Sequence, residues 1–151
     1  MRIALYEPDI PQNCGALLRL GACLGVAVDI IEPCGFLFSD KALRRAGMDY
    51  LPAADVTRHM RWSRFYDHSR AAATRLVLLT SKAEASYIDF AFSHRDTILL
   101  GRESAGVPQE VHDAADARLV IPMRPGMRSI NVAQAAAMVV GEALRQTKGF
   151  P

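Results

Sequence analysis

The side chains best suited to chemistry gather in a polar loop near the C-terminus, residues 123–131. This loop holds two arginines, two methionine sulfurs, the Ser129 hydroxyl and the Asn131 amide, directly before an apolar helical segment. Taken alone, Ser129 and Asn131 are typical of helix caps, because short polar side chains satisfy the unpaired N–H groups at a helix start. The arginines suit recognition of phosphate. Read alone, the loop therefore fits a helix start better than a ligand site.

Two further loops, residues 8–15 and 101–108, are expected at the same edge of a sheet. In open α/β sheets, ligands bind outside the carboxyl ends of the strands, where loops and helix N-termini present free backbone N–H groups. Gly101 and Gly106 are five positions apart, so the G-x-G-x-x-G pattern of a dinucleotide site is absent from both loops. By itself this glycine spacing is typical of a turn followed by a helix.

The histidines and cysteines form no pattern typical of a metal site. The H-E-x-x-H spacing is absent, and the histidines sit in polar stretches, which predicts exposed side chains at His59, His68, His94 and His112. The cysteines lack close paired spacing, so we expect buried free thiols at Cys14, Cys23 and Cys34. The sequence therefore predicts no metal ion.

Short apolar runs alternate with helical periodicity along the chain. Strands are expected at residues 3–6, 26–31, 76–80, 97–101 and 118–122, the last three of them central in the sheet. Helices are expected after a cap at Asn13 as far as Gly25, and at residues 40–46, 87–92, 108–115 and 131–146. The stretch 58–70 reads as helical or irregular. This alternation predicts an α/β fold with a mostly parallel, doubly wound sheet, and a flavodoxin-like or nucleotide-binding domain also fits the periodicity.

Composition limits the class of protein. The 151 residues are enough for one domain, half of them are hydrophobic, and no apolar run reaches the roughly 18 residues needed to cross a bilayer. The N-terminus lacks the apolar centre of a secretion signal, so we expect a cytoplasmic protein without a membrane partner. The net charge of +2 does not establish nucleic-acid binding, although arginine far outnumbers lysine.

The three loops together resemble a known family. Residues 11–19, 100–108 and 121–132 are similar, in this order, to the three motifs of the SPOUT class of RNA methyltransferases. Residues 31–36 and 41–50 extend the similarity to the small single-domain branch that modifies the tRNA wobble nucleotide. Three spaced motifs are far more specific than any one of them.

The resemblance implies a single SPOUT domain over residues 1–151, with helices on both faces of the sheet and a C-terminal trefoil knot. General topology rules would exclude such a knot. It also implies S-adenosylmethionine as cofactor, the tRNA anticodon stem-loop as partner and a homodimer. We expect the first and last helices at the subunit contact, with an apolar stripe of small residues at 135, 136 and 139–141.

The resemblance assigns roles to individual residues. The cofactor is expected against Leu79, Gly101, Ile121, Met123 and Ser129. Catalytic or site-supporting positions are matched by Asn13, Arg19, Glu103, Ser129 and Asn131. Basic residues expected to contact the RNA substrate are Lys41, Arg44, Arg45, Arg61 and Arg64.

The expected reaction is methylation of the ribose 2′-hydroxyl of nucleotide 34, a cytidine or a modified uridine. The family assigns the role of base to the arginine at position 19, but a guanidinium stays protonated in proteins. Arg19 could instead clamp the neighbouring phosphate, whose oxygen would accept the proton. Gly141 replaces a tyrosine usual in this branch, which leaves open another tRNA or rRNA position, or an RNA-binding homologue without catalysis.

Overall fold

The computed structural model describes residues 1–37 and 51–151, so the helix expected at 40–46 lies outside the described residues. The strands are β1 (Arg2–Tyr6), β2 (Ala27–Ile31), β3 (Val56–His59), β4 (Arg75–Leu79), β5 (Asp96–Leu100) and β6 (Ala117–Leu119). The α-helices are α1 (Pro11–Leu24), α3 (Trp62–Ala71), α4 (Gln109–Ala114) and α5 (Val132–Thr147), and two short 3₁₀ turns are η1 (Leu51–Ala53) and η2 (Tyr87–Asp89).

All six strands form one sheet in the order β3-β2-β1-β5-β4-β6, and every neighbouring pair is parallel. The predicted parallel sheet is confirmed, and the strands predicted at 3–6, 26–31, 76–80 and 97–101 are present within one or two residues. The strand at β6 is shorter than predicted and lies at an edge, so its expected central place is wrong. Parallel strands bring their carboxyl ends, and the loops that follow, to one edge of the sheet.

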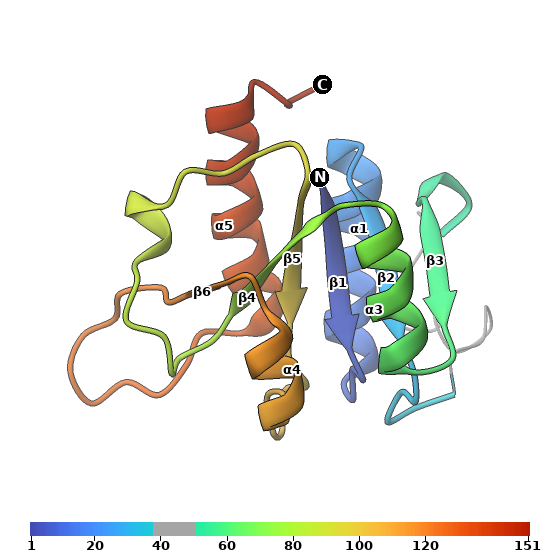
Figure 1. Ribbon diagram of the computed structural model, residues 1–151, viewed down its shortest axis with the longest axis horizontal. Coiled ribbons are helices and arrows are strands. Elements are labelled where there is room, and N and C mark those ends of the chain that lie inside the picture. The colour runs from blue at the N-terminus through green and yellow to red at the C-terminus, as the bar shows by residue number, and fades with distance from the viewer. Residues whose placement is uncertain (38–50) are drawn as a thin grey trace.

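Helices cover both faces of the sheet, as predicted (Figure 1). α1 and α5 pack on one face, where Leu17 and Leu18 meet Val139 and Val140 in one buried cluster. α3 and α4 cover the other face through Phe65 and Val111, which belong to a second cluster. Burial of these two apolar faces stabilises the layered arrangement. The knot implied by the resemblance stays a prediction.

The start of α1 differs from the expected one. Pro11 is the first residue of the helix and Ile10 holds the cap position, so the prediction of Asn13 as cap is wrong. Proline suits a first helical position because its missing N–H has no partner there in any case. Asn13 is therefore inside the first turn, where its side chain is available to other loops. The predicted stop is confirmed, because Gly25 ends α1 with a positive φ of 64°.

Two segments differ from what their periodicity predicts. Residues 58–70 hold the end of β3 as well as α3, and β3 was not predicted because V-T-R-H offers almost no apolar alternation. The helix expected at 87–92 is reduced to η2, a single 3₁₀ turn. α4 and α5 lie where they were predicted, and Asn131 caps α5.

The exposure predicted for polar side chains fails at β3. His59 is buried, since α3 covers it with Phe65 at a ring distance of 5.3 Å, and its Nε2 lies 2.7 Å from Asp29 Oδ1. The Arg2 guanidinium also binds this buried carboxylate, at 2.6 Å. A buried carboxylate needs such partners to offset its lost hydration. His112 is half-buried, whereas His68 and His94 are exposed as predicted.

The structure tests the predictions of buried thiols and of no membrane-spanning segment. Cys14 is buried as predicted and Cys34 is half-buried, but Cys23 is exposed on α1, so the prediction of a buried thiol there is wrong. Burial raises the pKa of the Cys14 thiol to about 12. Within residues 1–37 and 51–151, no helix is long and apolar enough to cross a lipid bilayer.

Candidate functional site

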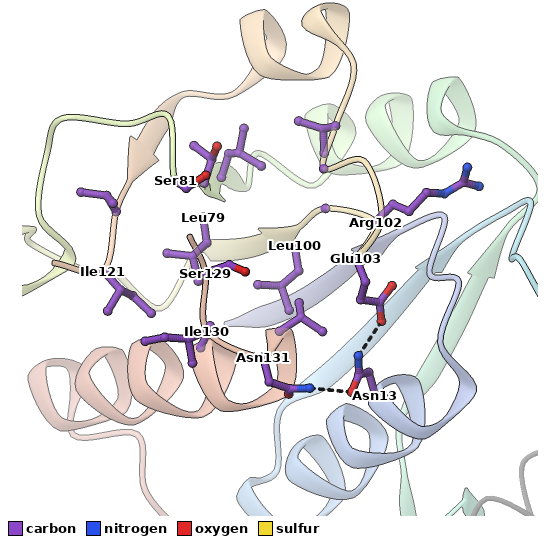
Figure 2. A pocket seen from close by; sticks show the side chains of 18 of the residues that line it. Asn13, Leu79, Ser81, Leu100, Arg102, Glu103, Ile121, Ser129, Ile130 and Asn131 are labelled. Atoms are coloured by element: carbon purple, nitrogen blue, oxygen red, sulfur yellow. Dashed lines mark hydrogen bonds between the residues drawn. The ribbon is translucent and has the colours of Figure 1, made fainter. Parts of the chain in front are cut away.

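A cavity of about 380 Å³ opens at the carboxyl ends of β4 and β5 (Figure 2). Its walls are largely apolar and come from the strand ends and from the segment after β6, through Leu78, Leu79, Leu100, Val120 and Ile121. Its rim is polar, because the loops after β1 and β5 and the loop before α5 add amide, hydroxyl and carboxyl groups. An apolar pocket with a few converging polar groups is typical of small-molecule sites.

Three side chains link the loops around this cavity in a continuous series of hydrogen bonds, which we call the amide bridge (Glu103, Asn13 and Asn131). The Asn13 Nδ2 group donates to Glu103 Oε1 at 3.0 Å, and Asn131 Nδ2 donates to Asn13 Oδ1 at 2.9 Å (Figure 2). Asn131 Oδ1 in turn accepts from the backbone N–H groups of Ala133 and Gln134. The amide bridge therefore joins the first, second and third motif loops to the N-terminus of α5.

Glu103 has an unusual environment for a carboxyl group. Its Oε2 accepts a hydrogen bond from the Asp9 backbone N–H at 3.1 Å, and its carboxyl group contacts that of Asp9. Burial, and next the contact with the Asp9 side chain, raise the pKa of Glu103 above its usual range. The contact with Glu103, followed by the hydrogen bond from the Ser104 hydroxyl, lowers the pKa of Asp9. The pKa values of the two carboxyl groups therefore shift in opposite directions.

The glycines of the second loop form a tight turn that shapes the cavity floor. Arg102 and Gly106 exchange two backbone hydrogen bonds, of 3.0 and 2.7 Å, and Gly106 has a φ of 68°. A Cβ at Gly101 would lie only 2.8 Å from the Gly106 carbonyl carbon, so the position has no room for a side chain. The Arg102 side chain points away from the cavity in Figure 2 and binds Glu7 at 3.1 Å. The five-residue glycine spacing is explained by this turn.

The structure brings most of the predicted site residues together. The five residues expected to contact the cofactor all line the cavity: Leu79, Gly101, Ile121, Met123 and Ser129. Four of the five expected catalytic or supporting residues also line it: Asn13, Glu103, Ser129 and Asn131.

The basic residues are placed elsewhere. Arg19 is exposed on α1 and, in the part of the chain that the structure describes, does not line the cavity. Arg61 and Arg64 are exposed at the start of α3, on the opposite face of the sheet from α1. The other three residues expected to contact substrate lie outside the described residues, at Lys41, Arg44 and Arg45.

Sequence reasoning missed several residues around the cavity. Thr80 and Ser81 follow β4 and add hydroxyl groups, and Ile10 adds an apolar side chain that is 40% exposed. The backbone N–H of Asp9 donates a hydrogen bond to Glu103. Ser81 directly follows the strand expected at 76–80, and Asp9 and Ile10 lie in the loop expected at 8–15. These positions were the available signal, because loops at the carboxyl ends of parallel strands share one edge. Among the described residues, no group of three or more histidine, cysteine or acidic side chains is arranged to hold a metal ion.

Asn131 allows a test of the amide bridge through stability. Asn131→Ala removes both the α5 cap and the bond to Asn13, so we expect it to lower the free energy of unfolding by about 1 kcal/mol or more. Asn131→Ser retains a capping oxygen but cannot reach Asn13, so it should cost clearly less. Urea unfolding of both variants, with the exposed Gln134→Ala as control, measures this. Equal stability of all three variants would contradict the cap.

Comparison with known proteins places these observations in a family. Residues 1–141 match the SpoU rRNA Methylase family. A protein of Beijerinckia indica named tRNA (cytidine(34)-2'-O)-methyltransferase is 60% identical over 144 residues, which are 95% of this chain and 90% of that protein.

Solved structures agree with the sequence match. A structure described as giving insights into the 2-OH methylation of C/U34 on tRNA superposes with a TM-score of 0.89 at 38% identity, covering 96% of this chain and 94% of that one. An AdoMet-bound rRNA methyltransferase from Sinorhizobium meliloti superposes with a TM-score of 0.85 at 26% identity, covering 95% of this chain and 55% of that one. The motif order, the parallel sheet and these similarities together show that the chain belongs to the SpoU methylase family.

Proposed function

We propose that this protein transfers a methyl group from S-adenosylmethionine to the ribose 2′-hydroxyl of nucleotide 34 in tRNA, a cytidine or a modified uridine. The observation that carries the proposal is the convergence of three loops on one cavity, joined by the amide bridge. The relatives named for methylation of cytidine 34 support the choice of substrate, because they are similar over nearly the whole chain. We further propose that residues 1–151 act as one domain.

The cavity suits the proposed cofactor in size and chemistry. Its volume of about 380 Å³ and its aliphatic walls fit an adenosine group, and the hydroxyl of Ser129 offers a polar partner beside them. The tight turn at Gly101 and Gly106 places their backbone beside Leu100 in the cavity wall. Leu79, Gly101, Ile121, Met123 and Ser129 would hold the cofactor, and the Sinorhizobium meliloti relative of the same fold is described as AdoMet-bound. When bound, S-adenosylmethionine supplies a methyl group on a positively charged sulfur.

The residues of the chain would contribute orientation and charge. In-line placement of the 2′-oxygen requires a rigid rim, which the amide bridge provides by fixing the Asn13 and Asn131 side chains. Arg19 would clamp the phosphate beside the reacting ribose and lower the pKa of its hydroxyl, with a phosphate oxygen accepting the proton. Lys41, Arg44, Arg45, Arg61 and Arg64 would bind the RNA backbone of the anticodon stem-loop.

Two alternatives differ in what the same cavity would do. A SpoU enzyme for another tRNA or rRNA position would use the cofactor but a different RNA, and the glycine at position 141 keeps this alternative open. An RNA-binding homologue without catalysis would need neither Glu103 nor Ser129. The presence of both at the cavity, with Asn131, favours an enzyme.

The proposed activity is tested by methyl transfer to tRNA in vitro. Purified protein and labelled S-adenosylmethionine are incubated with tRNA transcripts that carry cytidine or uridine at position 34, and the modified nucleotide is located by mass spectrometry. We expect 2′-O-methylation at position 34 and none in transcripts that carry a 2′-deoxyribose at that position. Methylation only at another nucleotide would favour the first alternative, and cofactor binding without transfer to any RNA would favour the second.

Arg19 provides a sharper test of the proposed mechanism. It lies six positions after Asn13 on α1, about 9 Å further along the axis, and its side chain is exposed. Arg19→Ala should lower single-turnover methylation by at least about 100-fold at saturating RNA while leaving cofactor affinity nearly unchanged. Arg19→Lys should recover little activity, because an ammonium group lacks the bidentate fork.

Matched arginine variants separate clamping from general RNA binding. Alanine at the exposed Arg61 or Arg64 should weaken RNA binding and reduce its salt dependence, with little effect on the rate at saturating RNA. Near-normal transfer by Arg19→Ala would remove Arg19 from the mechanism. Joint loss of cofactor binding and transfer would assign it to the fold instead.

We also propose a homodimer with α1 and α5 at the subunit contact. Most of the apolar stripe expected there is buried within its own chain, at Ala135, Ala136, Val139 and Val140, so it cannot form the contact. The exposed face of α5 instead presents Met138, 42% exposed, and Gly141, where an added Cβ would meet open space. Light scattering at micromolar concentration should give twice the mass of one chain. Met138→Glu should lower the measured mass toward that of a single chain. A monomeric wild type would refute the dimer.

A further inference from the structure

Asp9 lies beside the amide bridge, although neither the spacing of the motifs nor the family resemblance assigns it a role. It sits in the loop between β1 and α1, two residues before the helix begins. Its backbone N–H holds Glu103 Oε2 at 3.1 Å, and its Oδ2 accepts a hydrogen bond from the Ser104 hydroxyl. Asp9 therefore forms hydrogen bonds with two successive residues of the second motif loop, Glu103 and Ser104.

The other carboxylate oxygen of Asp9, Oδ1, is buried and lacks a hydrogen-bond donor among the described residues. A buried oxygen without a partner destabilises the folded protein, and more so when it is charged. The carboxyl group of Glu103 is in contact with Asp9, and two ionised carboxylates at this separation would repel each other. A single proton on Glu103 would turn the repulsion into an O–H donor facing Asp9.

The surrounding groups favour this arrangement. Burial raises the pKa of Glu103, whereas the contacts with Glu103 and Ser104 and the charge of Arg102 lower the pKa of Asp9, so Glu103 is the member of the pair that keeps a proton to the higher pH. Arg102 is itself paired with Glu7, and the nearby Cys14 thiol stays neutral because burial raises its pKa to about 12. The positive charge facing the pair therefore stabilises the ionised Asp9.

The segment after β2 also lies against Asp9. The Gly35 N–H donates to the Pro8 carbonyl oxygen at 2.9 Å, which brings the segment after β2 against this loop. A Cβ at Gly35 would lie 2.6 Å from the Asp9 Cβ and 2.9 Å from its Cα. This close approach leaves the Asp9 backbone little freedom, so the position of its carboxylate is well defined.

We infer that Asp9 is a positioning residue for methyl transfer, which shares one proton with Glu103 and thereby fixes the orientation of the Asn13 amide. With Glu103 held in place, the Asn13 Nδ2 group must face Glu103, and its Oδ1 must face Asn131. Without that constraint the Asn13 amide could turn over, and the bond to Asn131 would be lost. The inference rests on the proposed function for its catalytic part, whereas the shared proton can be measured without catalysis.

The shared proton is tested by carboxyl titration. Carbon-13 NMR of the glutamate side chains, with Glu103 assigned by Glu103→Gln, gives its midpoint in the wild type and in Asp9→Asn. The asparagine keeps the shape of Asp9 and its partner for Ser104, but it removes the negative charge and can donate to Glu103. We expect the Glu103 midpoint to fall by about one pH unit or more. Asp67→Asn, an exposed position on α3, should leave it unchanged.

The positioning role is tested by rates at saturating cofactor and tRNA. Asp9→Ala should lower the single-turnover rate about tenfold or more, with a KM for tRNA close to that of the wild type, because only orientation is lost. Asp9→Asn should retain the rate within about threefold, since its amide still holds Glu103 and Ser104. This rescue separates positioning from a general loss of structure.

Each result has a defined meaning. A Glu103 midpoint that is the same in Asp9→Asn as in the wild type would overturn the shared proton, even if the protein had no activity on tRNA. Wild-type rates in Asp9→Ala, or equal losses in Asp9→Ala and Asp9→Asn, would overturn the positioning role. A wild type that binds the cofactor but methylates no tRNA would instead refute the proposed function.

Discussion

The Asn13 amide connects parts of the chain that are far apart in sequence. It donates to a side chain 90 positions later and accepts from one 118 positions later. An amide can satisfy both partners in only one orientation, because its nitrogen and oxygen are not interchangeable as donor and acceptor. These bonds join the three loops that line the cavity between β4, β5 and α5. The rest of the fold brings these three loops to one edge of the sheet.

The parallel sheet provides that placement. β1 lies between β2 and β5, so the loop that begins α1 adjoins the loop after β5 at one edge of the sheet. α1 and α5 pack on the same face, which brings Asn13 in the first turn of one helix next to the cap of the other. The strand ends at Leu79 and Leu100 add apolar walls beside the polar rim. In the proposed function, the apolar walls bind the adenosine group and the adjacent polar rim orients the ribose.

The sequence predicted the buried frame well and the polar details poorly. β1, β4 and β5 are apolar runs with clear boundaries, and α5 has strong helical periodicity, so hydrophobic patterning was sufficient. β3 was missed because its V-T-R-H sequence is stabilised by pairing with β2 and by the Asp29–His59 contact, which no local pattern encodes. Local spacing predicts a cap at Asn13, because it cannot distinguish a local bond from one to a residue 118 positions away.

The central claim is that the three loops form the site for the methyl donor. A crystal structure of the protein grown with S-adenosylhomocysteine tests it most directly. We predict the product in the cavity, with its adenosine group between Leu79 and Ile121 and the amide bridge intact. Binding of the product at another surface, such as the hollow bounded by Cys34 and Arg58, or a cavity that excludes it, would contradict the account.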